Sequence, residues 1–325
     1  MNIGLVGLGH LGKIHLKLLQ EVDTFRITGI YDIDQKLTAE LAEKYRVKAF
    51  QNYDDLLNAS DAIDIVTPTI THNELASRAI RKGKHVFIEK PVTDNPDDAR
   101  KLSALAKEAG VKIQVGHVER FNPAFLAARP YIQNPQFIEI HRLAPFNVRG
   151  TDVSVIFDLM IHDIDLTLSL VNSNLKHIMA TGTPVVCDTP DIANARLEFE
   201  NGCVANITVS RVAFHATRKL RIFQKDCYIN IDLHNKTTEI ARLGPVSGNK
   251  HNNMVIDRGD GTKKEIRIEH PIIQPVNAIK FELESFYESI QTNTTPVVSI
   301  QDAIQALEVS SKIEETIRTK AMIRF

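Results

Sequence analysis

Several features that would place the protein in a specialised class are scarce or missing in its sequence. Its 325 residues include only three cysteines, without metal-ligand spacing and too few for a disulfide scaffold, so we expect reduced thiols. The formal net charge of −1 creates no global basic field, which argues against a nucleic-acid protein. No apolar run approaches the roughly 18 residues that span a bilayer, and no basic stretch at the N-terminus indicates a signal peptide. We therefore expect a cytoplasmic protein that binds neither nucleic acid nor a membrane.

What the chain does contain is typical of a globular protein with a large core. Hydrophobic residues make up 43% of it and charged residues 24%. At about 150 residues per domain, this length predicts two domains. Strand-like and helix-like segments alternate in the first third, whereas strands separated by turns dominate afterwards. We expect one domain over residues 1–118 and a second over residues 119–325.

A glycine-rich turn follows the first apolar run, and residues at helical spacing follow the turn. The turn reads Gly-Leu-Gly-His-Leu-Gly at residues 7–12. Gly7 permits a tight turn, Gly9 lets the backbone approach a pyrophosphate, and Gly12 allows the helix to pack closely on the strand. The helix N-terminus, where His10 and Leu11 lie, offers N–H groups and a positive dipole end to phosphates. These features predict a dinucleotide-binding turn.

An acidic residue after the second strand favours NAD over NADP. Asp32 stands twenty residues after Gly12, where a carboxylate accepts hydrogen bonds from the adenosine ribose and repels a 2′-phosphate. Asp34 is a neighbouring candidate, and its alternative role is that of a helix N-cap or turn residue. We expect NAD as the cofactor, with Asp32 on its ribose.

The alternation of strands and helices predicts a doubly wound parallel sheet, an α/β Rossmann domain, with ligands at the carboxyl ends of its strands. The expected strands are residues 2–6, 25–31, 47–50, 62–66, 85–88 and 112–115, and the strand at 62–66 is apolar apart from Asp64. The expected helices are residues 36–45, 53–58, 73–82 and 96–109. Polar or turn-forming residues at the strand ends are Thr67, Pro68, Glu89, Lys90 and His117.

A second chemical pattern lies in the C-terminal half, in the otherwise apolar run 157–165. Asp158 and His162 are four residues apart and at helical spacing share one face. A carboxylate beside an imidazole can orient its tautomer and raise its basicity, which suits proton transfer. The alternative is a buried helix whose polar side is satisfied by its neighbours. We expect no metal, because Asp158, His162 and Asp165 on one helix would not complete a coordination shell.

Four motifs together resemble the Gfo/Idh/MocA oxidoreductase family over essentially the whole chain. They are the glycine turn at 7–12, Thr67-Pro68-Thr69 with His72, the run Gly83-Lys84-His85-Val86-Phe87-Ile88-Glu89-Lys90-Pro91, and the D-x-x-x-H spacing of Asp158 and His162. The resemblance implies that the NAD site includes Thr67, Pro68, His72, Glu89 and Lys90.

The resemblance also implies roles in catalysis. Lys90 would hydrogen-bond the reacting hydroxyl, and His162, supported by Asp158, would accept its proton. Pro91 in such proteins often follows a cis peptide bond. Elementary chemistry agrees, because hydride leaves a carbinol carbon only as its O–H proton departs, so a base and a cation both assist.

Two stretches, 116–123 and 158–165, are similar to family members that oxidise nucleotide sugars, in particular C3 of UDP-N-acetylglucosamine, giving a 3-keto sugar for transamination on the way to lipid A. The alternatives are UDP-N-acetylglucosaminuronate, a free sugar or a polyol as substrate, or a non-catalytic NAD-binding sensor, which the intact Lys90, Asp158 and His162 disfavour. Arginine suits bidentate contact with phosphate, although Arg120, Arg142 and Arg149 can equally form ion pairs. The expected substrate-binding residues are His117, Glu119, Arg120, Asn122, Arg149 and His162.

For the C-terminal domain the sequence predicts an α+β fold with a large open, mostly antiparallel sheet. The expected strands are 137–143, 177–183, 193–200, 203–212, 218–224, 227–233, 238–243 and 264–269, with helices at 277–291 and 300–319 and an exposed loop or hairpin at 244–261. Asn201-Gly202 is a tight-hairpin signal. The family resemblance implies that another subunit covers the open face of this sheet, giving a homodimer or homotetramer, and that helix 300–319 packs toward the nucleotide domain.

Overall fold

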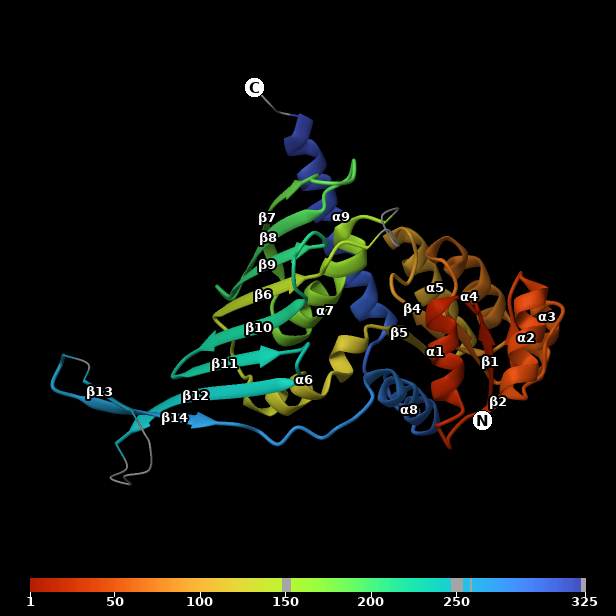
Figure 1. Ribbon diagram of the computed structural model, residues 1–325, viewed down its shortest axis with the longest axis horizontal. Coiled ribbons are helices and arrows are strands. Elements are labelled where there is room, and N and C mark those ends of the chain that lie inside the picture. Colours follow the sequence, from red (N-terminus) through yellow and green to blue (C-terminus); the bar gives the residue numbers. More distant parts are fainter. Residues whose placement is uncertain (148–152, 247–253, 258, 323–325) are drawn as a thin grey trace. The chain divides into compact units, whose positions relative to one another are not determined.

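The computed structural model in Figure 1 describes residues 1–147, 153–246, 254–257 and 259–322. The chain forms two compact units, and each consists of two chain segments. The first unit comprises Met1–Phe121 and Val276–Glu308, and the second comprises Asn122–Pro275 and Val309–Phe325. The chain thus passes into the second unit after Phe121. It returns to the first unit at Val276, a change of unit that the sequence pattern does not predict.

A five-stranded, fully parallel sheet forms the centre of the first unit. Its strands are β1 (Asn2–Val6), β2 (Arg26–Tyr31), β3 (Ala62–Ile65), β4 (His85–Glu89) and β5 (Ile113–Gly116), in the order β2-β1-β3-β4-β5. The helices between them are α1 (His10–Leu19), α2 (Gln35–Tyr45), α3 (Tyr53–Ala59), α4 (His72–Arg81) and α5 (Pro96–Ala109). The predicted Rossmann domain is confirmed. The strand order reverses between β1 and β3, which is where such sheets bind nucleotides.

Side-chain caps explain where three of these helices begin. Asp34, Asn52 and Asn95 each accept a hydrogen bond from the backbone N–H three residues further on, at the starts of α2, α3 and α5. Asp34 is therefore a helix N-cap, as its alternative reading proposed.

The strand predicted at residues 47–50 is wrong. Its pairing with the sheet is a single parallel bridge between Ile30 and Ala49, held by two backbone hydrogen bonds of Ile30, to Lys48 and from Phe50. The chain turns away directly afterwards, because Asn52 begins α3. A stretch of four residues was too short to distinguish these two outcomes.

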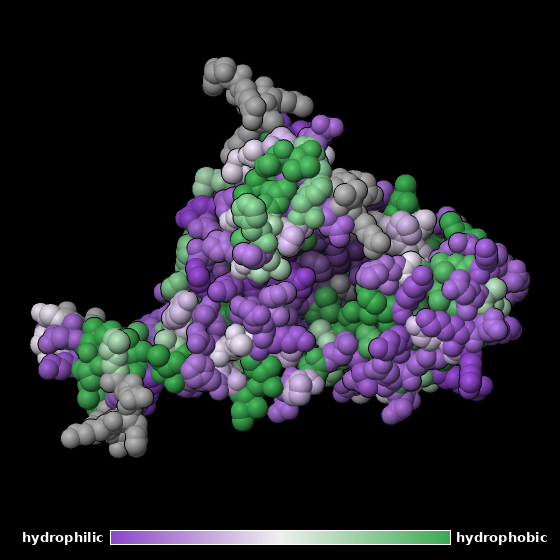
Figure 2. All heavy atoms as spheres, viewed as in Figure 1, coloured by the Kyte–Doolittle hydropathy of each residue, from purple (hydrophilic) through white to green (hydrophobic). Residues whose placement is uncertain are grey.

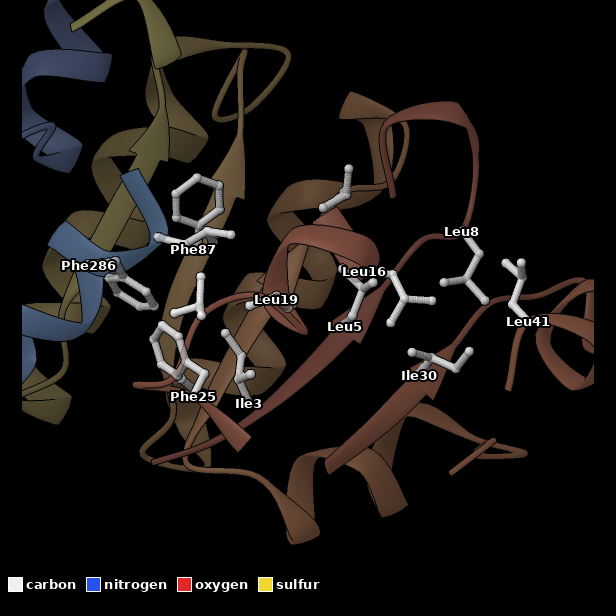
Figure 3. Close-up of a cluster of buried hydrophobic side chains, with 14 of the residues drawn as sticks. Ile3, Leu5, Leu8, Leu16, Leu19, Phe25, Ile30, Leu41, Phe87 and Phe286 are labelled. Atoms are coloured by element: carbon white, nitrogen blue, oxygen red, sulfur yellow. The ribbon is translucent and has the colours of Figure 1, made fainter. Parts of the chain in front are cut away.

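The main core of this unit lies between the sheet and the helices α1 and α8 (Ala278–Gln291) (Figure 3). Ile3 and Leu5 of β1 and Phe87 of β4 meet α1 leucines and Phe286 of α8. Gly4 points to the opposite face, where a Cβ would lie 2.7 Å from the side chain of Leu56 in α3. Helices therefore cover both faces of the sheet, and the predicted helix at 277–291 corresponds to α8.

The second unit is built on a nine-stranded sheet of order β13-β14-β12-β11-β10-β6-β9-β8-β7. Neighbouring strands are antiparallel except β6 and β9, so the predicted mostly antiparallel sheet is confirmed. The strands are β6 (Phe137–Leu143), β7 (Leu175–Thr183), β8 (Ile192–Phe199), β9 (Val204–Ser210), β10 (Thr217–Gln224), β11 (Cys227–Asp232), β12 (Thr237–Pro245), β13 (Met254–Asp257) and β14 (Lys263–Glu269). Its helices include α6 (Pro123–Ala128) and α7 (Ile161–Leu170), whereas α9 (Ile300–Met322) has residues in both units.

Two turn regions of this sheet follow the sequence prediction. Gly202, with φ +84°, lies in the predicted hairpin between β8 and β9. Within the stretch 244–261, β12 extends to Pro245 and β13 pairs with β14, while residues 247–253 and 258 lie outside the described part. All four residues of β13 are exposed, as expected of an exposed hairpin, although their sequence Met-Val-Ile-Asp has no apolar–polar alternation that would predict a strand.

Apolar side chains gather at the β13–β14 end of the sheet (Figure 2). Met254 and Ile268 are 67% and 66% exposed, respectively. Over the described residues, no helix has both the length and the apolar character needed to cross a membrane.

A buried ion pair fastens the loop between β7 and β8. Oδ1 of Asp191 lies 2.8 Å from Nε of Arg211, and Oδ2 accepts hydrogen bonds from the backbone N–H groups of Val185, Val186 and Cys187. Burial opposes ionisation of Asp191, but the backbone donors and Arg211 outweigh it and hold its pKa far below the usual range. Arg211 also donates to the carbonyl of Val153, so the pair fixes the segment that leads toward α7.

Replacing this carboxylate should destabilise the protein in a pH-dependent way. An Asp191→Asn side chain would turn its NH2 group toward either the backbone N–H donors or Arg211, and it would remove the counter-charge of the buried Arg211, which costs about 3 kcal/mol at neutral pH. Because the folded-state pKa of Asp191 lies below the unfolded value, its contribution is present above that unfolded value and is lost as the pH falls. Urea unfolding should therefore show a gap between wild type and variant that narrows from about pH 5 to about pH 3.

The matched control is Asp188→Asn in the same loop, where the side chain is exposed. It should change the free energy of unfolding by less than about 0.5 kcal/mol. Equal effects of the two substitutions would contradict the role assigned to Asp191.

Candidate active site

The three glycines of the β1–α1 turn have different surroundings. Gly7 has φ +93°, and a Cβ there would lie 2.4 Å from the carbonyl oxygen of Val66. A Cβ on Gly12 would lie 2.0 Å from the carbonyl oxygen of Gly7. At Gly9 no atom lies within 4 Å of an added Cβ. Folding therefore requires Gly7 and Gly12 to be glycine, whereas at Gly9 open space is kept beside the backbone.

That open space lies at the start of α1. Gly9 is the N-cap of the helix and supplies no side-chain hydrogen bond to its first N–H groups. His10 is exposed and Leu11 is half-buried, so the first turn of the helix is accessible. N–H groups at a helix N-terminus together with the helix dipole suit an anionic pyrophosphate, and the missing side chain at Gly9 permits its close approach.

The carboxylate of Asp32 is held beside this turn at the end of β2. Oδ2 accepts a hydrogen bond of 2.7 Å from the backbone N–H of Leu8, and Oδ1 accepts one of 2.9 Å from Asp34. Each carboxylate oxygen has two acceptor positions, so the orientation is fixed while capacity for ribose hydroxyls remains. The geometry fits the expected contact with the ribose of NAD.

The loops after β3 and β4 are joined by a buried histidine. In His72, Nε2 lies 2.8 Å from the carbonyl oxygen of Thr67, and Nδ1 lies 2.9 Å from that of Pro91. Burial lowers the pKa of His72, although the two carbonyl contacts oppose the shift. His72 therefore acts on the predicted cofactor site by holding these two loops, while Pro68 forms a turn in which its carbonyl accepts from Thr71.

Glu89 and Lys90 stand at the end of β4, where the sequence places them. Glu89 is buried, Lys90 is half-buried, and the Lys90–Pro91 peptide bond is cis, as the resemblance implied. Glu89 packs against the backbone of β5, since a Cβ on Gly116 would lie 2.7 Å from Oε1 of Glu89. The backbone N–H of Lys90 donates to Oε2 of Glu89 at 3.2 Å.

Sequence reasoning missed two residues beside Glu89. His15 of α1 and Asp64 of β3 are both fully buried and contact one another, and His15 also contacts Glu89. Asp64 was visible only as an interruption of an apolar strand, and His15 only as a polar residue on the inward side of a helix.

The substrate candidates after β5 are largely enclosed. His117 and Glu119 are buried, and a guanidinium nitrogen of Arg120 lies 3.4 Å from a carboxylate oxygen of Asp302. In the second unit, Asn122 is the N-cap of α6 through Oδ1, and its Nδ2 donates to the carbonyl of Leu233. Arg149 lies outside the described residues.

The helix that carries Asp158 and His162 is not a continuous α-helix, which corrects the sequence prediction. Residues Ile156–Met160 form a π-helical turn containing Asp158, and His162 lies in the first turn of α7. Both side chains are half-buried. A π-helical turn in a helix is uncommon and is frequent at functional sites, because it alters the direction of its side chains.

A buried ion pair holds this helix against the sheet. Nε and Nη2 of Arg142 in β6 lie 2.9 and 2.7 Å from the two carboxylate oxygens of Asp163 in α7. Arg142 is therefore a structural arginine, and the phosphate alternative for it is withdrawn. Asp163, which had no role in the sequence analysis, fixes the position of the turn that presents His162. Across the described residues, no group of three or more His, Cys, Asp or Glu side chains is arranged to hold a metal ion.

The parallel sheet, the open glycine turn and the carboxylate at the end of β2 define an NAD-binding Rossmann domain, and Lys90 stands at the end of β4. The class is that of NAD-dependent oxidoreductases. Residues 1–117 match the oxidoreductase family with an NAD-binding Rossmann fold, GFO_IDH_MocA, and residues 116–229 match the GFO/IDH/MocA C-terminal domain. The chain belongs to the Gfo/Idh/MocA oxidoreductase family, and NAD is its cofactor.

Several sugar and polyol dehydrogenases are similar to this chain. The UDP-N-acetylglucosamine 3-dehydrogenase of Acidithiobacillus ferrooxidans is 39% identical over 245 residues, covering 75% of this chain and 78% of that protein. Its solved structure has a TM-score of 0.88 at 33% identity and covers 98% of both chains. Myo-inositol 2-dehydrogenase of Thermotoga maritima is 24% identical over 343 residues, covering 100% of this chain and 98% of that protein. These relatives are named for the oxidation of a nucleotide sugar and of a polyol, respectively.

The different surroundings of the glycines predict different effects of alanine. Gly9→Ala should leave the melting temperature within about 2 °C of wild type, since the added methyl group meets no protein atom. It should weaken NAD binding at least about tenfold, because the methyl group occupies the approach to the pyrophosphate. NADH fluorescence titration and thermal unfolding measure the two effects separately.

Gly12→Ala is the contrasting variant. Its methyl group would collide with the carbonyl of Gly7, so it should lower stability as well as NAD binding. Wild-type affinity for NADH in Gly9→Ala would show that the pyrophosphate does not lie at this turn.

Proposed function

We propose that this protein oxidises the C3 hydroxyl of UDP-N-acetylglucosamine to the 3-keto sugar, with NAD as hydride acceptor. The observation that carries the proposal is its similarity, over nearly the full length of both chains, to the A. ferrooxidans enzyme of that activity. Lys90 after β4, Asp158 in the π-helical turn and His162 in α7 support it, because these residues match the catalytic motifs of the family.

The reaction removes a hydride from C3 and a proton from its hydroxyl oxygen, so that the C–O bond becomes a C=O bond. NAD, when bound, supplies the acceptor for the hydride. In this proposal Lys90 donates a hydrogen bond to the hydroxyl oxygen and stabilises the negative charge that develops there. His162 accepts the hydroxyl proton as general base, and Asp158 orients the imidazole and stabilises its protonated form.

We propose five residues for the contacts with the sugar and the diphosphate of the substrate. Arg120 and Arg149 are proposed for the diphosphate, and His117, Glu119 and Asn122 for the sugar or the riboses. Burial of His117 and Glu119 is consistent with contacts inside an enclosed site. A keto group at C3 is the reactant that a transaminase requires, so the proposed product can enter synthesis of a diamino sugar such as that of lipid A.

A second candidate substrate is a free polyol. The similarity to myo-inositol 2-dehydrogenase covers the whole chain, although at lower identity. We also propose that the protein self-associates through its nine-stranded sheet, since exposed apolar residues such as Met254, Val255 and Ile268 gather at one end of it.

A panel of substrates tests the assignment directly. The purified protein with NAD should form NADH with UDP-N-acetylglucosamine, and its kcat/KM should exceed that for free N-acetylglucosamine or myo-inositol by at least about a hundredfold, because the diphosphate supplies binding energy. Absorbance of NADH measures the rate. Turnover of myo-inositol alone would discard the nucleotide-sugar assignment and favour the polyol.

Two substitutions test the catalytic roles. Lys90→Ala should lower kcat about 100- to 1,000-fold through loss of charge stabilisation. His162→Ala should lower kcat about 100- to 10,000-fold through loss of the general base. NADH titration should give nearly unchanged cofactor affinity for His162→Ala.

The matched controls are Lys84→Ala, which precedes β4, and His177→Ala, which is exposed on β7. Both should keep the wild-type rate. Near-normal turnover in Lys90→Ala or His162→Ala would refute the role given to that residue.

A further inference from the structure

Three ionisable side chains are buried together beneath the end of β4. His15, Asp64 and Glu89 are 0%, 0% and 8% exposed, respectively. Nδ1 of His15 lies 2.9 Å from Oδ2 of Asp64, and Nε2 lies 3.2 Å from Oε1 of Glu89. One imidazole thus bridges two carboxylates inside an otherwise apolar core, where uncompensated charge is strongly destabilising.

The register of the parallel sheet brings these residues together. Asp64 in β3 pairs with Leu5 and with Phe87, so it lies on the sheet face that α1 covers. Glu89 lies two residues beyond Phe87 and therefore on the same face. His15 reaches across from α1, and its ring packs 5.8 Å from that of Phe87.

The contacts favour a charged imidazole between the carboxylates. Burial alone would lower the pKa of His15, but the charges and hydrogen bonds of Asp64 and Glu89 outweigh it and raise the pKa well above its ordinary value. Burial alone would raise the pKa of Glu89, but the contact with His15 and the charge of Lys90 lower it. His15 therefore keeps Glu89 ionised in a place where an unassisted carboxyl group would be protonated.

Glu89 connects this cluster to Lys90. Its Oε2 accepts the backbone N–H of Lys90 at 3.2 Å, and the charge of the Lys90 ammonium contributes to the ionisation of Glu89. The carboxylate has little room to move, because it fills the space that a Cβ on Gly116 would occupy. On the other side, His72 holds the carbonyl of Pro91. Two buried histidines thus hold the Lys90–Pro91 segment: His72 contacts the carbonyl of Pro91, and His15 acts through Glu89.

We propose that His15 is a positioning residue for alcohol oxidation: with Asp64 behind it, it fixes the Glu89 carboxylate, and Glu89 fixes Lys90 at the reacting oxygen. The inference rests on the proposed function only in assigning Lys90 to that oxygen. A role confined to core stability is the competing explanation. The two differ in whether the effect of His15 on the rate passes through Lys90.

A double-mutant cycle separates these explanations. His15→Gln should lower kcat about 30-fold in the wild-type background, because a displacement of about 1 Å at a catalytic group costs up to a hundredfold, and should leave KM for NAD and sugar within about twofold. In a Lys90→Ala background the same change should lower kcat by less than about twofold. Glu89→Gln should behave in the same way, which keeps the test usable if His15→Gln folds poorly.

The control variant is His85→Gln at the opposite end of β4, where Nδ1 of His85 accepts the backbone N–H of Lys112. It should leave kcat unchanged in both backgrounds. Equal losses from His15→Gln with and without Lys90, or a rise in KM that accounts for the loss, would overturn the proposal and favour a purely structural role.

A measurement without substrate examines the cluster itself. In protein with 15N-labelled histidine, the resonances missing from His15→Gln identify His15, and both of its ring nitrogens should be protonated at neutral pH because its pKa is raised. In Glu89→Gln the His15 imidazole should lose this proton at lower pH. A neutral His15 at neutral pH in the wild type would overturn the proposal.

The substrate panel, run with the wild-type protein before any variant, shows whether the proposed function fails. If a polyol is oxidised in place of UDP-N-acetylglucosamine, the cycle is run with that polyol, and its outcome decides the role of His15 independently of the sugar. If no alcohol is oxidised, Lys90 has no reacting oxygen to serve, and both proposals fail.

Discussion

Helix α1 lies very close to the backbone of the turn that precedes it. The candidate site depends on this constraint. An atom added at Gly12 would stand 2.0 Å from the carbonyl of Gly7, and one added at Gly7 would stand 2.4 Å from the carbonyl of Val66. These contacts bring α1 down onto β1 and β3. The same approach that exposes helix N–H groups to a pyrophosphate also lets His15 reach Asp64 across the sheet. Cofactor binding and the buried cluster therefore share one structural cause.

Much of the fold and part of the site could be predicted from the sequence because their signals are local. Glycine spacing, apolar strands and the caps at Asp34, Asn52 and Asn95 act within a few residues, and the structure contains the elements they predict. The cluster could not be predicted in this way. His15 and Asp64 are 49 positions apart, and only the register of β3 against β4 shows that they meet beside Glu89.

The errors have similar physical causes. Arg142 was a phosphate candidate because its type suits phosphate, yet Asp163 on another element neutralises it in the core. The π-helical turn at Ile156–Met160 has the same residue types as an α-helix, so a four-residue spacing could not reveal it. The choice of substrate also depends on contacts between side chains that are far apart in the sequence. Relatives with this fold are named for inositols as well as for a nucleotide sugar, so the side chains that contact the sugar, and not the fold, must decide.

The bridged carboxylates beneath β4 also bear on how this protein can be engineered. Apolar residues of similar volume in place of a buried ionic cluster are often neutral or stabilising, by about 1–4 kcal/mol. Apolar substitutions of His15, Asp64 and Glu89 are therefore expected to raise thermal stability and to lower turnover. Variants selected only for resistance to heat would accumulate apolar replacements there and lose the reaction. A screen for stable forms of this enzyme has to select for catalysis in the same round.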